Sequence, residues 1–164
     1  AGVMGLSLDE DGAWDLRLRA AMAAGAPLID GRATDLVVTN KGVEQPRLAD
    51  SILQAARVRF THTEFISCPG CGRTLYDLQG TIARIKAAVS EAAASLPRLN
   101  TLKIAIMGCI VNGPGEMADA DYGYVGAARH KVSLYRGKVC VEKNIPEEEA
   151  VERLLQLIRE DGEA

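Results

Sequence analysis

Three cysteines and one glutamate lie on two glycine-rich segments of this 164-residue chain. Cys68 and Cys71 flank a Pro-Gly dipeptide, and Cys109 begins a second glycine-rich segment that ends at Glu116. Two thiolates separated by two residues can bind one metal ion or cluster when the turn between them directs both sulfurs the same way. On its own, such a pair is compatible with zinc, an iron-sulfur cluster or a redox-active dithiol.

Both cysteine segments directly follow predicted strands. Residues 61–67 alternate as a strand and lead into the 68–71 turn, and the apolar run 102–107 leads into Cys109. If these strands are neighbours in one sheet, Cys109 faces the 68–71 turn and a third thiolate joins the site. A dithiol redox centre does not need a third thiolate, so the arrangement favours a metal site.

The fourth ligand has two candidates. Cys140 lies within an apolar strand without a turn, where a thiol more often packs as a small core residue. Glu116 lies on the same glycine-rich segment as Cys109. From its spacing alone, Glu116 is equally compatible with a role as a metal ligand and with being a solvated loop acid. A carboxylate is a hard, exchangeable ligand, so a site of three cysteines and Glu116 would leave one iron open to substrate.

Length and composition restrict the class of protein. A chain of 164 residues fits one compact domain, or one domain plus a fragment of another, and can bury an apolar core. The formal net charge of -3 provides no basic footprint for nucleic acid. No apolar run approaches the roughly 20 residues needed to cross a bilayer, and the Ala1-Gly2 start lacks a secretory profile. We therefore expect a cytoplasmic protein with neither nucleic-acid nor membrane partners.

The pattern of apolar residues predicts an α/β (α+β) fold, a mixed sheet with flanking helices. Residues 1–12 are expected to be irregular. The expected helices are 13–24, ended by Gly25 and Pro27, then 46–57, a helix from about 75 or 81 to 95, and 146–159. The expected strands are 35–39, 61–67, 102–107, 122–125, 131–135 and 139–142. We expect residues 1–60 to form a lead-in with a strand-helix unit and residues 61–164 to form the metal-binding domain.

Three segments resemble the 4-hydroxy-3-methylbut-2-enyl diphosphate synthase family at its cluster-binding end. They are residues 65–73, residues 106–116 and residues 118–126, the last similar to the plant-type, three-domain form of the family. Upstream, residues 27–31 and 35–38 are similar to the last strand-helix unit of the preceding barrel domain. The resemblance covers about residues 20 to 160.

The resemblance implies a [4Fe-4S] cluster on Cys68, Cys71, Cys109 and Glu116, with Glu116 as the exchangeable ligand. It also implies a fold like the iron-sulfur domain of sulfite and nitrite reductases. The implied reaction opens 2-C-methyl-D-erythritol 2,4-cyclodiphosphate and dehydrates it reductively, with electrons from ferredoxin or flavodoxin. Asn112 is a candidate for contacting the substrate or the cluster, and a turn-forming role is equally compatible.

The resemblance further implies a part that this chain does not contain. The family binds the diphosphate on a large barrel domain, and a diphosphate needs several convergent Arg or Lys side chains. We therefore expect the barrel to come from the same full-length polypeptide or a homodimer partner, and the chain alone to be inactive. The alternative is a small zinc-stabilised binding module that uses Cys140 as its fourth ligand.

Overall fold

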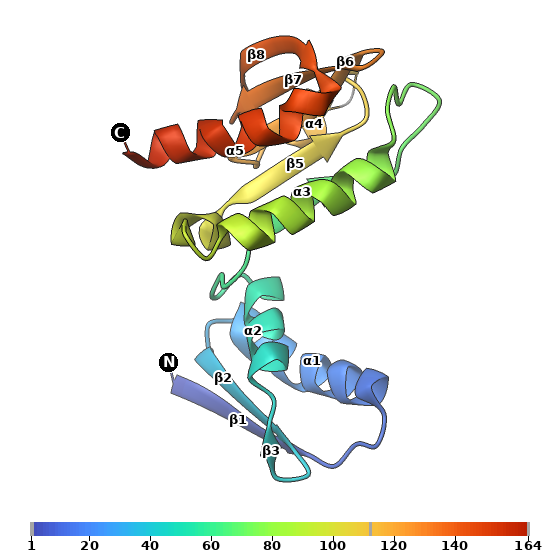
Figure 1. Cartoon of the computed structure of the whole chain (residues 1–164). Helices are drawn as coiled ribbons and strands as arrows, with labels where there is room; N and C mark the ends of the chain where they lie inside the picture. The colour runs from blue at the N-terminus through green and yellow to red at the C-terminus, as the bar shows by residue number, and fades with distance from the viewer. Residues whose placement is uncertain (1, 112, 164) are drawn as a thin grey trace. The chain divides into compact units, whose positions relative to one another are not determined.

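The computed structural model describes residues 2–111 and 113–163, which divide into two compact units, Ala1–Thr61 (unit 1) and His62–Ala164 (unit 2). Both units combine a sheet with flanking helices, which confirms the predicted α/β class (Figure 1). No helix among the described residues is both long enough and apolar enough to cross a membrane.

Unit 1 is a three-stranded sheet with two helices. Its elements are β1 (Gly2–Leu8), α1 (Ala13–Ile29), β2 (Ala33–Asn40), β3 (Val43–Glu44) and α2 (Pro46–Ala55). The sheet order is β1-β2-β3, with β1 parallel to β2 and β3 antiparallel to β2. The core lies between β2 and the helices, where Leu28, Val38 and Leu53 are at most 2% exposed.

Two expectations for unit 1 were wrong. Residues 2–8 are not irregular, because they form β1, which pairs in parallel with β2 and half-buries Met4, Leu6 and Leu8 against the core, whereas residues 9–12 belong to no strand or helix. Helix α1 does not stop at Gly25. Buried residues recur every fourth position as far as Leu28, and this packing outweighs the lost N–H of Pro27.

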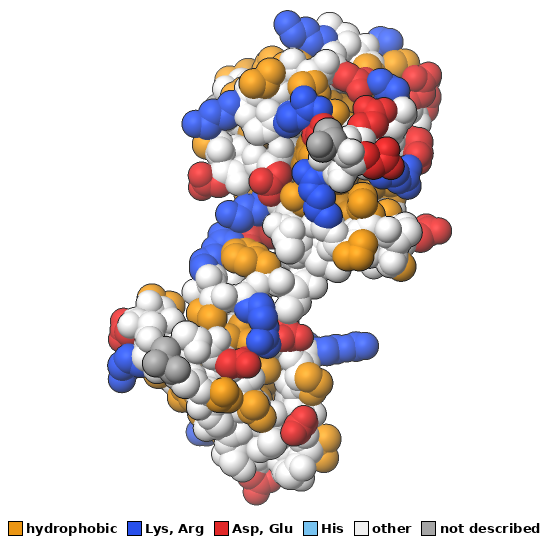
Figure 2. All heavy atoms as spheres, turned by 90° about the vertical axis from the view of Figure 1, so that its left-hand side faces the viewer, with side chains coloured by type: hydrophobic (Ala, Val, Ile, Leu, Met, Phe, Trp, Pro, Cys, Tyr) orange, Lys and Arg blue, Asp and Glu red, His pale blue; other side chains and the backbone are white. Residues whose placement is uncertain are grey.

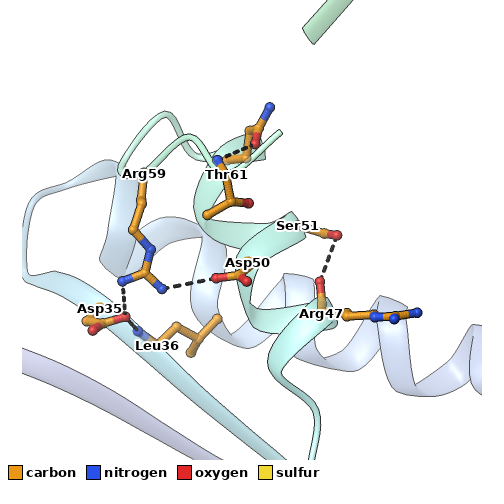
Figure 3. A network of polar contacts seen from close by, with 8 residues as sticks. Asp35, Leu36, Arg47, Asp50, Ser51, Arg59 and Thr61 are labelled. Carbon is orange, nitrogen blue, oxygen red and sulfur yellow. Dashed lines mark hydrogen bonds and ion pairs between the residues drawn. The ribbon is translucent and has the colours of Figure 1, made fainter. Parts of the chain in front are cut away.

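The chain that follows α2 is held onto unit 1 by polar contacts (Figure 3). The Arg59 guanidinium lies 3.1 Å from a carboxylate oxygen of Asp35 and 3.1 Å from one of Asp50. The Thr61 N–H donates to the side-chain oxygen of Gln54 at 3.0 Å. Half-exposed ion pairs each contribute about 0–1 kcal/mol, so these contacts chiefly fix the path of residues 57–61.

Unit 2 is a five-stranded mixed sheet with helices on both faces. Its elements are β4 (Glu64–Ser67), α3 (Leu78–Ala92), a 3-10 helix η1 (Pro97–Thr101), β5 (Lys103–Met107), α4 (Gly113–Glu116), β6 (Tyr122–Ala128), β7 (Lys131–Arg136), β8 (Val139–Pro146) and α5 (Glu147–Glu163). The order is β4-β5-β6-β7-β8; the first three strands are parallel and the last three antiparallel. Every strand predicted for this part of the chain is present.

The two faces of this sheet have different coverings. Helices α3 and α5 cover one face, where Ile85, Ile104 and Leu154 are fully buried (Figure 1). The other face packs against the turns after α4, with Met107 and Met117 at its centre. The neighbouring parallel strands β5 and β6 are therefore buried on both faces, which agrees with the nearly continuous apolar run of β5.

Acidic and basic side chains are interleaved on the part of unit 2 where the chain ends (Figure 2). Asp161 of α5 accepts hydrogen bonds from the Arg136 guanidinium and from the Tyr122 hydroxyl. The Arg136 guanidinium lowers the pKa of Asp161 below its ordinary value. Arg98 donates to Tyr122 and to the carbonyl of Ile158, so this network attaches the end of α5 to the sheet.

Candidate metal centre

The two cysteine segments meet at one edge of the unit 2 sheet. Strands β4 and β5 pair in parallel, with Ser67 opposite Ile106, so their carboxyl ends are adjacent. Cys68 directly follows β4, and Cys109 follows β5 after one glycine. The prediction that these strands are neighbours is confirmed, and the third thiol lies on the same edge as the first two.

A pocket of about 90 Å³ lies at this edge. Its lining consists of Cys68, Pro69, Gly70, Cys71, Arg73, Met107, Cys109, Gly113 and Glu116. The three cysteines and the glutamate therefore line a single pocket, although the two segments are far apart in the sequence. Glu116 is on the short helix α4, whereas the sequence predicted a loop there. Asn112 lies outside the described residues.

The described side chains of the pocket do not form a recognisable single-ion site. Among residues 2–111 and 113–163, no group of three or more His, Cys, Asp or Glu side chains is close enough to hold one metal ion. A structural zinc site brings four ligands onto one ion, so the zinc alternative is not supported. In a cubane cluster each thiolate binds a different iron, so the ligands surround a larger body.

Cys140 is not part of the pocket. It is half-buried on β8, where it packs against the cluster that includes Met107, Met117 and Tyr135. Its thiol donates weakly to the carbonyl oxygen of Glu142 at 3.5 Å. The interpretation of Cys140 as a small core residue is therefore confirmed.

Backbone and side-chain donors surround the thiols. The Gly108 N–H donates to the sulfur of Cys68 at 3.2 Å. The pKa of the Cys71 thiol lies below its ordinary value because the Arg73 N–H and guanidinium both favour the thiolate. Thiolates stabilised by N–H donors are the ligand form that soft metals and iron-sulfur clusters require, so the donor set fits such a group.

Two further side chains join the cysteine segments, and no sequence pattern indicated a role for either. The Tyr76 hydroxyl donates to the Met107 carbonyl at 2.8 Å, at the end of β5. Thr74 accepts the Cys71 N–H at 3.1 Å and also lies against Gly108. The Tyr76–Met107 and Thr74–Gly108 contacts link residues more than 30 positions apart, which no local pattern predicts.

A thiol-lined pocket at the carboxyl ends of parallel strands makes unit 2 a candidate metal-binding α/β domain. The chain belongs to the GcpE protein C-terminal domain family, whose family model matches residues 64–160.

Curated relatives extend the similarity over most of the chain. It is 62% identical to a Bacteroides thetaiotaomicron protein over 156 residues, which are 93% of this chain and 24% of the relative. It is 60% identical to a Parabacteroides distasonis protein over 90% of this chain and 24% of the relative. A Chlorobaculum tepidum protein is 55% identical over 88% of this chain and 19% of the relative. Each is named 4-hydroxy-3-methylbut-2-en-1-yl diphosphate synthase (flavodoxin). The chain thus spans about a quarter or less of these relatives.

Proposed function

We propose that unit 2 is the cluster-binding domain of an oxidoreductase and holds a [4Fe-4S] cluster on Cys68, Cys71, Cys109 and Glu116. The observation that carries this proposal is the single pocket lined by all four side chains. When bound, the cluster would supply electrons and a coordination position at one iron. The three thiolates would hold it, with the Gly108 N–H donating to the Cys68 sulfur, and Glu116 would be its exchangeable ligand.

The whole enzyme is proposed to be a 4-hydroxy-3-methylbut-2-enyl diphosphate synthase. Its substrate would be 2-C-methyl-D-erythritol 2,4-cyclodiphosphate, which loses one oxygen as water when two electrons and two protons are added. The relatives' names support flavodoxin as the electron donor, with ferredoxin as the alternative. We propose a role for Asn112 in contacting the substrate or the cluster.

Diphosphate binding is assigned to a part of the enzyme outside this chain. Arg73 is the one Lys or Arg side chain among the described residues that line the pocket. A single guanidinium is too little for a diphosphate, which usually binds several convergent cations. A substrate-binding barrel, from the same polypeptide or a homodimer partner, would supply the others, so the isolated chain would not turn over substrate.

Unit 1 is proposed to be the end of the domain that precedes the cluster domain. One face of α1 carries large apolar side chains that nothing in unit 1 covers: Trp14 (73% exposed), Leu18 (50%), Met22 (74%) and Ile29 (72%). An exposed apolar stripe of this kind marks a contact surface. Because the relatives are about four times longer and the family model is for a C-terminal domain, the proposed occupant is a helix from the preceding part of the same polypeptide.

Metal content tests the cluster proposal directly. Anaerobic reconstitution of the 164-residue chain with iron and sulfide should give a brown protein with about four irons per chain. Iron and sulfide analysis and the visible absorption spectrum provide the measurement. A colourless protein that instead retains one tightly bound zinc would contradict the proposal.

Substitutions on α1 test the domain proposal. Changing Trp14, Leu18 and Met22 together to Gln should leave the isolated chain folded but lower the melting temperature of the longer polypeptide. Each side chain that is buried only in the longer polypeptide contributes about 1.5–3 kcal/mol. Leu16→Gln is the control, because Leu16 is 9% exposed and packed inside unit 1, so its loss should destabilise both proteins. Equal melting temperatures for the triple variant and the unchanged longer polypeptide would refute the assignment.

A further inference from the structure

Thr74 lies where the two cysteine segments approach each other. Its N–H donates to the Cys71 carbonyl at 2.9 Å, and its hydroxyl oxygen accepts the Cys71 N–H at 3.1 Å. This pair of bonds closes the turn that carries Cys71. The Thr74 side chain is half-buried and lies against Gly108, the residue that follows β5.

Gly108 leaves the space that Thr74 fills. A methyl group at Gly108 would lie 2.5 Å from the Thr74 hydroxyl oxygen and 3.0 Å from its methyl carbon, closer than real side chains pack. The Gly108 carbonyl also lies against Gly126 of β6, because a methyl group at Gly126 would lie 2.4 Å from the Gly108 oxygen. Gly108 therefore packs against both Thr74 and β6.

The same glycine carries the N–H that donates to Cys68, at 3.2 Å from the sulfur. Thr74 thus contacts Cys71 directly, through its hydroxyl. It also packs against Gly108, the residue whose N–H donates to the Cys68 sulfur. The Cys71 turn and the segment leading to Cys109 are joined at this point. Displacing Thr74 would alter the separation between the thiols of both segments.

We propose that Thr74 is a positioning residue for the cluster site, which sets the spacing of the thiol-bearing segments and the Gly108 N–H···S bond. The proposal rests on the proposed cluster function. Outer-shell groups that orient metal ligands typically change affinity 10–100-fold when they are removed. Hydrogen bonds to cluster sulfurs also help to set the reduction potential.

The first experiment compares Thr74→Val with Thr74→Ser in the reconstituted 164-residue chain. Valine keeps the shape of threonine but cannot accept the Cys71 N–H, whereas serine retains the hydroxyl. Thr74→Val should release iron to a chelator about tenfold faster, with a lower reduction potential and an altered electron paramagnetic resonance spectrum. Thr74→Ser should resemble the unchanged chain. If both variants release iron at the same rate, whether that rate is normal or increased, the proposed role of the hydroxyl is wrong.

A second measurement uses the metal-free chain, so it separates failure of this inference from failure of the cluster proposal. Amide hydrogen exchange at Cys71, whose N–H loses its acceptor, should be faster in Thr74→Val and unchanged in Thr74→Ser, while exchange in unit 1 stays the same. If exchange at the Cys71 amide is unaffected by Thr74→Val, the inference is wrong whether or not iron binds.

A double-mutant comparison tests the packing. Gly108→Ala should impair cluster retention because its methyl group collides with the Thr74 side chain. Adding Thr74→Ala removes the atoms at 2.5 and 3.0 Å and leaves the Thr74 β-carbon at 3.2 Å, so it should partly restore retention. Additive losses in the double variant would show that Thr74 and Gly108 do not act together.

Discussion

Replacing Cys109 with serine is expected to abolish cluster retention in the reconstituted chain. Serine is a poor ligand for iron, and the two remaining thiols belong to a single turn on one side of the pocket. Loss of an outer-shell partner already costs 10–100-fold in metal affinity, so loss of this ligand should cost more than about 100-fold. Iron content after desalting should fall from about four per chain to less than one.

Cys140→Ser is the matched control for this experiment. Cys140 is also half-buried in unit 2, but it packs against Met107 and Tyr135 and does not line the pocket. The variant should retain its iron and its visible spectrum, with at most a small loss of stability from placing a hydroxyl in a partly apolar site. Loss of iron on Cys140→Ser together with retention on Cys109→Ser would reverse the assignment of ligands.

Replacing Glu116 with alanine is expected to have the second large effect. The variant should retain the cluster but lose catalytic turnover, so it distinguishes cluster binding from catalysis. The three thiolates remain, so the isolated chain should still take up iron, but its visible and electron paramagnetic resonance spectra should change. In the full-length enzyme with reduced flavodoxin, product formation should fall by at least about 100-fold, because the exchangeable ligand is lost. Product is measured as 4-hydroxy-3-methylbut-2-enyl diphosphate released per enzyme.

Asp119→Asn is the control for Glu116→Ala. Asp119 is an exposed acid three residues further along, and it does not line the pocket. Its replacement should leave the spectra and the turnover unchanged, which would separate a ligand effect from a general loss of negative charge. Normal spectra and normal turnover in Glu116→Ala would show that Glu116 is only a solvated acid. Asn112→Ala in the same assay tests the proposed contact of Asn112.

The secondary structure of unit 2 could largely be predicted from local patterns. The apolar run of β5 and the helical spacing of Ile85 and Val89 are each visible within a few residues. Unit 1 was predicted less well. A parallel strand such as β1 is stabilised by its pairing with β2, and the residues of β1 alone do not predict this pairing. Helix α1 passes Gly25 and Pro27 because of tertiary packing by Leu28.

Residue types and local patterns alone indicated which groups could bind a metal and that each cysteine segment follows a strand. They could not decide between Glu116 and Cys140 as partners of the three thiols. The tertiary structure placed β4 beside β5, brought Glu116 to the pocket lining and packed the half-buried Cys140 against a core cluster away from the pocket. It also revealed Thr74 against Gly108. These facts depend on strand order and on contacts between distant residues, which are fixed by packing of the whole sheet and not by any local run of residues.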